Sequence, residues 1–361
     1  MSNKLPENPE TQGKDKAVGL GRFPSWLHRN LPVGGNLFKT NGILAKNRLN
    51  TVCEEAKCPN RFECYSKKTA TFLALGKECT RNCGFCDIDF SKTPKMPESD
   101  EPIRIANSVK ELGLKHVVIT MVARDDLPLG GAEYIAAIIR VVRQENPGVT
   151  IEVLTSDFSG DFTAIDRILA ENPDIFNHNI ETVRELSPRV RHKASYERTL
   201  SVLRYVKDCP NHPFNLETAV GDGKVTQSFE PEPFPIGGPF TVRECAPPIE
   251  RDSDSKSCIT LPSRTAVSRV VKSGIMVGLG ESELQVKQTI EDLKNAGCDI
   301  ITIGQYLQAD QRKLLVKEFI TPERFKAYEE YGHSIGVKQM YCGPFVRSSY
   351  NADEIQKLIS Q

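Results

Sequence analysis

The sequence predicts an α/β fold, a partial (β/α)6 TIM-like barrel with an N-terminal cysteine-rich extension and a C-terminal tail. Short apolar runs alternate with amphipathic segments of helical length, a pattern that indicates βαβ units and a parallel sheet. A chain of 361 residues with 39% hydrophobic residues can bury a sizeable core. A TIM-like barrel places functional groups at the carboxyl ends of its strands.

The order of the elements supports this class. The predicted strands are the six apolar runs at 69–76, 116–122, 150–156, 175–181, 273–281 and 301–307. The predicted helices between them are the amphipathic segments 103–113, 130–145, 196–208 and 283–297. Six strand and helix units are fewer than the eight of a closed barrel, so we expect an open one.

The chain divides into four predicted parts. These are a disordered lead-in (1–22), an extension with one helix in an irregular collar (23–68), the barrel (69–340) and the tail (341–361). Between 211 and 270, eight prolines and four glycines interrupt the barrel, which is typical of an inserted loop. Because the insert follows a helix and precedes a strand, we expect it on the face opposite the active-site loops. Cys245 and Cys258 within it have no tight ligand spacing and stay unassigned.

Charge and hydropathy exclude several classes of protein. Basic and acidic residues balance at 47 each, so no net charge draws the chain to nucleic acid or to a membrane surface. No apolar run approaches the roughly 18 residues that span a bilayer. The first sixteen residues, MSNKLPENPETQGKDK, resemble neither a secretory signal nor a transit peptide. We therefore expect a cytoplasmic protein without nucleic-acid or membrane partners.

Cysteine usage points to metal chemistry. Six of the eleven cysteines fall between Cys53 and Cys86, and thiols that stay reduced and clustered are typical metal ligands. Directly after the first predicted strand, three of them form a CxxxCxxC motif: Cys79, Cys83 and Cys86. Three thiolates without a nearby fourth can bind a cubane iron–sulfur cluster and leave one iron open. A structural zinc site and chance clustering of buried cysteines are the alternatives, and zinc normally takes four ligands.

A second set of three cysteines lies just upstream. Cys53, Cys58 and Cys64 have the spacing CxxxxCxxxxxC and again lack a fourth thiol at short range. A second cluster is the simplest interpretation. The alternative is that all six thiols bind two zinc ions by sharing ligands.

These motifs resemble the radical S-adenosylmethionine (SAM) superfamily, and within it the lipoyl synthase family. The resemblance rests on TVCEEAKCPNRFEC followed by CTRNCGFCD, and it extends over roughly 24–352 apart from the insert. Further matching segments are VIT (118–120), RDDL (124–127), NHNIET (177–182), RVR (189–191), MVGLGE (276–281), TIGQY (302–306) and GPFVRSSY (343–350). The chain departs from the family pattern at Ser156, at Gln308–Asp310, at Cys342 and in the insert.

The resemblance implies a role for each matching residue. Cys79, Cys83 and Cys86 would ligate a catalytic 4Fe–4S cluster, with Phe85 as the aromatic residue before the third cysteine. Cys53, Cys58 and Cys64 would hold an auxiliary 4Fe–4S cluster whose fourth ligand is the oxygen of Ser349, a hard and labile ligand. The implied SAM contacts are Gly130 and Gly131, Asn179 and Glu181, and also Thr120, Arg191 and Gln305. Taken alone, each of these segments has a simpler interpretation. The glycine pair would cap a helix, His178, which precedes Asn179, would be a core histidine, and 347–350 would be a polar tail.

The resemblance also implies the reaction. A 5′-deoxyadenosyl radical would abstract hydrogen at carbons 6 and 8 of a protein-bound octanoyl-lysine, and two sulfurs from the auxiliary cluster would be inserted. Implied partners are octanoylated lipoyl carrier domains (E2 subunits of 2-oxoacid dehydrogenases and the glycine cleavage H protein), an electron donor and iron–sulfur assembly or carrier proteins. Two rival functions are another sulfur-inserting radical SAM enzyme, similar to biotin synthase, and a non-catalytic metal-binding scaffold.

Overall fold

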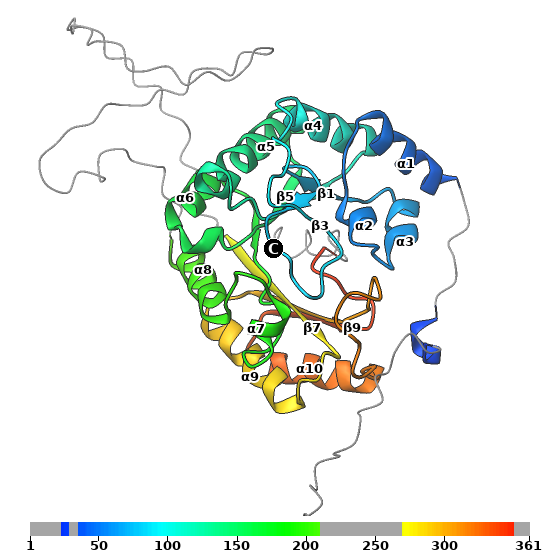
Figure 1. Cartoon of the computed structure of the whole chain (residues 1–361), viewed down its shortest axis with the longest axis vertical. Coiled ribbons are helices and arrows are strands. Elements are labelled where there is room, and N and C mark those ends of the chain that lie inside the picture. Colours follow the sequence, from blue (N-terminus) through cyan, green and yellow to red (C-terminus); the bar gives the residue numbers. More distant parts are fainter. Residues whose placement is uncertain (1–22, 29–34, 210–268, 350–361) are drawn as a thin grey trace, which may run out of the picture. The chain divides into compact units, whose positions relative to one another are not determined.

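The computed structural model describes residues 23–28, 35–209 and 269–349, and its centre is one parallel sheet of seven strands (Figure 1). The strand order is β1-β4-β5-β6-β7-β8-β9, and every neighbouring pair is parallel. The strands are β1 (Thr71–Ala74), β4 (His116–Met121), β5 (Thr150–Leu154), β6 (Ile175–Asn177), β7 (Val270–Val277), β8 (Ile300–Gln305) and β9 (Gln339–Gly343). The α/β class and the open barrel are confirmed.

Helices follow the strands and form a ring around the sheet (Figure 1). The ring helices are α4 (Glu101–Leu112), α5 (Ala132–Glu145), α6 (Phe162–Ala170), α8 (Tyr196–Asp208), α9 (Glu283–Asn295) and α10 (Pro322–Ser334). The smaller elements are η1 (Ser25–Leu27), α1 (Asn36–Lys46), α2 (Val52–Glu55), α3 (Arg61–Ser66), β2 (Glu78–Cys79), β3 (Asp89–Phe90), η2 (Pro128–Gly131), η3 (Phe158–Gly160) and α7 (Ser187–Val190). Side chains cap several of these helices, and at α9 Ser282 and Gln285 form a capping box.

All six predicted strands are present, and the structure adds a seventh that the sequence analysis missed. This strand, β9, lies at the edge of the sheet beside β8. Of its residues only Met340 is fully buried, so the segment lacks the continuous apolar run that marks a central strand. The four predicted helices correspond to α4, α5, α8 and α9, whereas α6 and α10 were not anticipated.

Strand alternation separates an apolar outer face from a polar inner face. The outer face packs against the ring helices through fully buried aliphatic and aromatic side chains, including Ile119, Val153, Phe176, Val271 and Ile303. On the inner face, Thr120 pairs with Leu154 and Gly274 pairs with Thr302, and all four line a cavity. The sheet therefore presents small and polar groups to the inside of the barrel, together with apolar side chains such as Leu73 and Leu154.

A buried ionic cluster closes the barrel beneath this cavity. Two residues before the cavity-lining positions of their strands, Glu152 on β5 and Lys272 on β7 pair at 3.0 Å with no exposed side-chain surface. The amide of Asn177 donates to the same carboxylate at 2.8 Å, and the His116 ring lies 3.3 Å from it. Burial acts to raise the pKa of Glu152, but the charge of Lys272 together with His116 and Asn177 outweighs it and lowers the pKa to about 2. The floor of the barrel therefore contains a buried carboxylate, and a buried ammonium group balances its charge.

The N-terminal helices stand at the opening between the two edge strands, β1 and β9 (Figure 1). Thr51, just before α2, forms an antiparallel bridge with Phe72 on β1. On the other side, the Asn60 amide donates to the Phe345 carbonyl oxygen at 2.7 Å, two residues beyond β9. The cysteine-rich extension is therefore tied to both edges of the open barrel.

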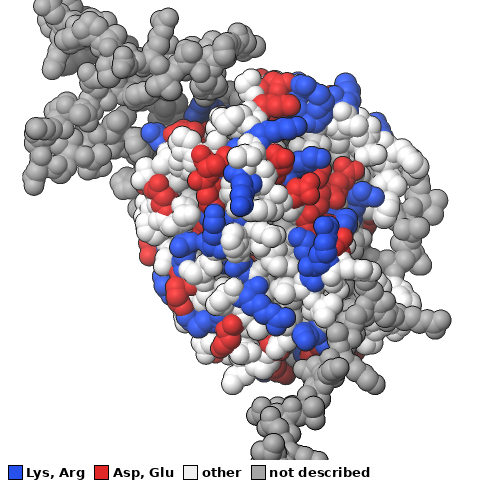
Figure 2. All heavy atoms as spheres, viewed as in Figure 1, with Lys and Arg blue, Asp and Glu red and all other residues white. Residues whose placement is uncertain are grey.

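Several sequence predictions fall on parts of the chain that the structure leaves out. The lead-in 1–22, residues 29–34, the insert 210–268 with Cys245 and Cys258, and residues 350–361 lie outside the described residues. Helix α8 ends at Asp208 and β7 begins at Val270. Figure 2 shows Lys, Arg, Asp and Glu intermingled on the face viewed. In the described part of the chain, the helices are too short or too polar to cross a bilayer.

Candidate functional site

A cavity of about 680 Å³ opens at the carboxyl ends of the strands, and both sets of cysteines line it. Its wall also includes residues from the strand ends or following loops of β4, β5, β6, β7, β8 and β9. The structure brings twelve predicted site residues to this wall: Cys53, Cys58, Cys64, Cys79, Cys83, Cys86, Thr120, Asn179, Glu181, Arg191, Gln305 and Ser349. Apart from the six clustered cysteines, these residues are far apart in the sequence, and the fold brings them together.

The CxxxCxxC loop follows β1 and is fixed by backbone hydrogen bonds. The amide of Gly84 donates to the carbonyl of Val190, and the carbonyl of Gly84 accepts from the amide of Leu314 at 3.0 Å. Backbone amides also point at the sulfurs, with His192 donating to Cys83 Sγ at 3.3 Å and Arg81 to Cys79 Sγ at 3.4 Å. Amide donors of this kind stabilise thiolates.

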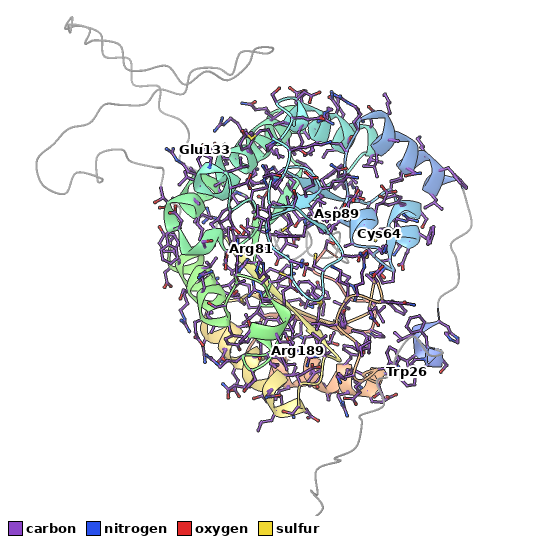
Figure 3. The ribbon with its side chains drawn as sticks, viewed as in Figure 1. Trp26, Cys64, Arg81, Asp89, Glu133 and Arg189 are labelled. Carbon is purple, nitrogen blue, oxygen red and sulfur yellow. The ribbon has the colours of Figure 1, made fainter. Side chains whose placement is uncertain are left out.

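A buried arginine inside this loop anchors it to the barrel. Arg81 binds Asp125 through two nitrogens, at 2.7 and 3.0 Å, and binds Asp157 at 2.6 Å. Asp157 is fully buried and also accepts from Arg198 at 3.1 Å. Burial acts to raise the pKa of Asp157, but the charge of Arg81 together with His178 and the hydrogen bonds from Arg81 and the Ser159 amide outweighs it and lowers the pKa to about 2. Figure 3 shows Arg81 inside the ring of helices, in contrast to Glu133 on its outer side.

Sequence reasoning missed this network. Arg81 is separated from its two aspartates by 44 and 76 residues, so no local pattern links them. The available signal was the position of Arg81 between two of the clustered cysteines, Cys79 and Cys83. A charged residue there must be either exposed or paired.

The chemistry of the six thiols fits iron–sulfur clusters. All six are free, and burial raises the pKa of Cys53 and Cys86 to about 12 and that of Cys64 to about 11. Burial also raises the pKa of Cys79 and Cys83. A positive metal centre would relieve this penalty by binding the thiolates. Within the described residues, no three Cys, His, Asp or Glu side chains are grouped so that they could hold a metal ion.

The upstream cysteines lie on two short helices. Cys53 is in α2, which begins after Thr51, whose hydroxyl accepts from the Glu54 amide at 3.3 Å. Cys64 is in α3, and Cys58 lies in the turn between the helices. One ion pair connects this segment to the CxxxCxxC loop, since Lys57 Nζ lies 2.8 Å from the Asp87 carboxylate directly after Cys86.

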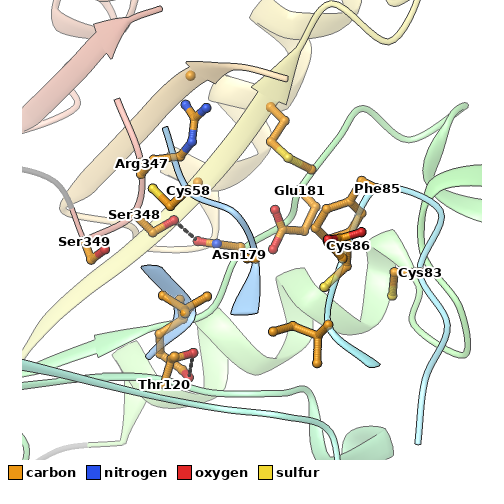
Figure 4. Close-up of a pocket in the computed structure, with 18 of the residues that line it drawn as sticks. Cys58, Cys83, Phe85, Cys86, Thr120, Asn179, Glu181, Arg347, Ser348 and Ser349 are labelled. Carbon is orange, nitrogen blue, oxygen red and sulfur yellow. Dashed lines mark hydrogen bonds between the residues drawn. The ribbon is translucent and has the colours of Figure 1, made fainter. Parts of the chain in front are cut away.

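The C-terminal tail enters the same cavity. Phe345, Val346, Arg347, Ser348 and Ser349 line it, beside Cys58 (Figure 4). The Ser348 hydroxyl donates to the Asn179 side-chain oxygen at 2.8 Å. The predicted ligand Ser349 makes no side-chain hydrogen bond to other described residues, so its hydroxyl oxygen is available for another partner.

Beyond β6, the NHNIE segment brings a half-buried acid to the cavity wall that the CxxxCxxC loop also lines. Glu181 has a left-handed backbone (φ 68°), fixed by bonds to the backbone of Gly274 and Met276. Burial raises the pKa of Glu181, and the opposing positive charge of Arg191 limits this rise. Glu181, Arg191 and Cys83 all line the cavity.

His178 is a satisfied core histidine, as its sequence alone suggested. Its ring is 2% exposed, with Nδ1 2.9 Å from the Thr155 carbonyl oxygen and Nε2 3.1 Å from the Thr199 hydroxyl. The Thr199 oxygen accepts from Arg191 at 2.6 Å, so the histidine helps to orient Arg191 indirectly.

Two other predicted contacts use their polar groups within the protein. Thr120 donates its hydroxyl to the Leu154 carbonyl oxygen at 3.1 Å. The Gln305 side chain donates to the carbonyl oxygens of Val277, Tyr306 and Glu318 and accepts from the Ile320 amide. Gln305 therefore braces the loop after β8, although it lines the cavity.

The predicted glycine pair is not part of the cavity wall. Gly130 and Gly131 have left-handed backbones, and Gly131 is the N-cap of α5. A methyl group added to Gly130 would approach Phe158 to 2.9 Å, and one added to Gly131 would approach Leu75 to 2.7 Å. Close packing and helix capping thus explain why glycine occurs at both positions.

Comparison with protein families gives two matches. Residues 73–228 match the Radical SAM superfamily, and residues 2–58 match the N-terminal domain of lipoyl synthase of the Radical SAM family. Among solved structures, methylornithine synthase (PylB) aligns over 83% of this chain and 74% of its own, with a TM-score of 0.47 and 11% identity.

Curated relatives match over nearly the whole chain. Lipoyl synthase of Protochlamydia amoebophila is 54% identical over 97% of this chain and 92% of its own length. Lipoyl synthase of Chlamydia muridarum is 43% identical over 100% of this chain and 97% of its own length. Lipoyl synthase of Chlamydia felis is 46% identical over 92% of this chain and 89% of its own length.

Proposed function

The chain belongs to the lipoyl synthase family of radical SAM enzymes, and from this premise we propose that it inserts two sulfur atoms into a protein-bound octanoyl chain. The observation that carries this proposal is the meeting of two sets of three free thiols and a serine-bearing tail on one cavity wall. A single cavity can hold a radical source, a sulfur donor and an acyl chain together.

In our proposal, Cys79, Cys83 and Cys86 hold a 4Fe–4S cluster and leave one iron open. When bound there, the reduced cluster supplies the electron that cleaves SAM to its adenosyl radical. The protein's own contribution is to hold the loop rigid, through the backbone of Val190 and Leu314 and through Arg81. A fixed loop keeps the site of cleavage within reach of the substrate.

Glu181 and Arg191 would hold the methionine end of SAM. An amino acid carries one ammonium and one carboxylate, and these two residues place opposite charges beside Cys83. Asn179 would contribute hydrogen bonds on the same wall. Thr120 and Gln305 would contribute the shape of the pocket, because their polar groups already have partners inside the protein. Gly130 and Gly131 would act indirectly, by packing against Phe158 and Leu75 outside the cavity wall.

Cys53, Cys58, Cys64 and Ser349 would hold the auxiliary cluster, the sulfur-donating substrate. The serine oxygen suits a fourth ligand that must leave, because a hard oxygen on a thiolate-bound iron is a weak ligand. Ser349 lies on the same wall as the three thiols, and its hydroxyl makes no hydrogen bond within the described residues.

The acyl chain would lie against the apolar part of the wall, which includes Leu73, Val122, Ile275 and Met276. A hydrocarbon chain offers no charge to grip, so shape and exclusion of water must position it. The proposed carriers are octanoylated E2 subunits of 2-oxoacid dehydrogenases and the glycine cleavage H protein. An electron donor and iron–sulfur assembly or carrier proteins complete the set of partners, in the reducing cytoplasm.

Anaerobic reconstitution of the full chain tests this function. We expect about eight irons per chain, cleavage of SAM on reduction, and a gain of two sulfurs by an octanoylated carrier domain in mass spectrometry. A colourless protein that binds zinc would favour the scaffold. Cleavage of SAM without any gain of sulfur by the carrier would favour the rival radical SAM enzyme.

Ser349→Ala tests the oxygen ligand. We expect this variant to cleave SAM but to transfer little sulfur, with Ser201→Ala on the exposed side of α8 as the control. Full sulfur transfer by Ser349→Ala would refute this ligand.

A further inference from the structure

The wall of the barrel has a slot in which the C-terminal tail lies. At Gly304 on β8, a methyl group would overlap the carbonyl oxygen of Val346 and approach Arg347 Nη1 to 3.0 Å. The backbone of Gly304 is not left-handed, so conformational freedom does not explain the glycine. Glycine at this position lets the backbone of the tail approach the strand closely.

A second strand glycine forms the other side of the slot. A methyl group at Gly274 on β7 would lie 2.7 Å from the Thr302 hydroxyl, 2.8 Å from Ser348 Oγ and 2.9 Å from Asn179 Oδ1. Gly274 and Thr302 are directly paired in the sheet. The neighbouring strands β7 and β8 thus each omit a side chain where the tail lies against them.

Asn179 connects the tail to the acid beside the CxxxCxxC loop. Its side-chain oxygen accepts from Ser348 at 2.8 Å, and Glu181 lies two residues further along the same segment. Figure 4 shows Asn179 between Ser348 on one side and Glu181, Phe85, Cys83 and Cys86 on the other. Asn179 therefore contacts the residue next to Ser349, and its own short segment carries Glu181 on the same cavity wall.

The outer end of the tail is tied to the upstream cysteines. The Asn60 amide donates to the Phe345 carbonyl oxygen at 2.7 Å, and Asn60 is two residues from Cys58. The tail thus has one anchor on the cysteine-rich extension and another on the barrel. Ser349 is the next residue after the barrel anchor Ser348.

We propose that Gly274, Gly304 and Asn179 form a seat for the tail segment 346–349, and that Asn179 couples this segment to the SAM-binding end of the cavity. In this proposal Asn179 and Ser348 are positioning residues that hold Ser349 toward the upstream cysteines and Glu181 toward the CxxxCxxC loop. The inference rests on the proposed function for its ligands, whereas the seat itself depends only on the folded chain. Coupling of this kind is reciprocal, so disturbing the tail must also weaken SAM binding.

Hydrogen exchange of the full chain, without added iron, tests the seat. In Gly304→Ala the new methyl group displaces Val346, so we expect peptides covering 346–349 to exchange about 10-fold faster or more. Gly343→Ala is the matched control, because its methyl group would meet Val346 at an ordinary 3.4 Å. Unchanged exchange of the tail in Gly304→Ala would overturn the seat.

Ser348→Ala gives a milder test that removes one hydroxyl and no backbone contact. We expect about 2- to 10-fold faster exchange of the tail, the effect of one hydrogen bond. If Gly304→Ala does not fold, Ser348→Ala alone tests whether the tail is seated. Unchanged hydrogen exchange of peptides covering 346–349 in Ser348→Ala would then overturn the seat.

Binding of SAM to the reconstituted full chain tests the coupling. We expect Ser348→Ala to weaken SAM binding about 5-fold, with Ser201→Ala unchanged. Equal affinity in Ser348→Ala and the parent chain would overturn the coupling. If the parent chain binds no SAM, the coupling fails together with the proposed function, and hydrogen exchange still decides the seat.

Discussion

The two cysteine loops face the same cavity but are held in different ways. The loop of Cys79, Cys83 and Cys86 is part of the barrel, and backbone hydrogen bonds and the buried Arg81 network fix it. The loop of Cys53, Cys58 and Cys64 lies on helices of four and six residues at the open edge of the sheet. Its described side-chain contacts with distant parts of the chain include Asn60 to Phe345 and Lys57 to Asp87.

This difference fits the two proposed tasks. A site that generates a radical repeatedly needs ligands that stay in place, and burial of paired charges supplies that rigidity. A site whose cluster is consumed must open and be refilled, and short helices at the edge of a sheet open at a lower free-energy cost than a loop anchored inside the barrel. The following predictions test this comparison, from the largest expected effect to the smallest.

Removing one thiol from each loop should have separable consequences. We expect Cys83→Ala to lose about four of eight irons and all SAM cleavage, because the catalytic cluster needs three thiolates. Cys58→Ala should lose about as much iron but keep SAM cleavage while sulfur transfer stops. Iron analysis, detection of 5′-deoxyadenosine and mass spectrometry of the carrier distinguish the two. Loss of SAM cleavage in Cys58→Ala would contradict the division of labour.

Breaking the anchor of the catalytic loop should destabilise the whole fold. Asp157→Asn leaves Arg81 buried with only part of its charge compensated, which typically costs about 3–5 kcal/mol. Chemical denaturation of the full chain measures the free energy of unfolding. Glu283→Gln, at an exposed ion pair on α9, is the control and should leave the midpoint nearly unchanged. A similar midpoint in both variants would show that the Arg81 network does not stabilise the fold.

Stability should also depend on pH through His178. Burial, assisted by the charge of Arg191, lowers the pKa of His178 from 6.5 to about 4. Between these values the unfolded chain binds a proton that the folded chain does not. The free energy of unfolding should therefore fall as pH decreases from about 6.5 to about 4, by on the order of 3 kcal/mol from this group.

The matched variant for this pH dependence is His178→Gln, which cannot bind that proton. We expect a flatter curve of unfolding free energy between pH 6.5 and 4, and no difference in slope above pH 7. Chemical denaturation across this range measures both curves. Identical slopes below pH 6.5 would rule out His178 as the source.

The smallest effect is expected at the ion pair between the two loops. Lys57 is more than half exposed, although its partner Asp87 is nearly buried. We expect Lys57→Ala to lower the melting temperature only slightly, and less at high salt, because solvent and ions screen the pair. Lys57→Arg should retain the parent value. A large, salt-independent loss would show that the two loops are more firmly joined than this comparison implies.

The sequence alone determined the fold class and indicated the cysteines that we propose as ligands. The six strands predicted from the sequence carry apolar runs because a parallel sheet is covered by helices, and this signal is local. Cysteine spacing is also local, so the motifs around Cys79 and Cys53 could be identified without a structure. The edge strand β9 was missed because only Met340 is fully buried there, and local hydropathy is then weak.

The tertiary structure alone decided which distant groups meet. Arg81 and Asp157 are 76 residues apart, and Asn179 and Ser348 are 169 apart, so only closure of the barrel brings each pair together. It also separated Gly130 and Gly131, which pack behind the wall, from Gly274 and Gly304, which make room for the tail. A sequence records which residue types are present, whereas close packing of strands determines which of them share a cavity.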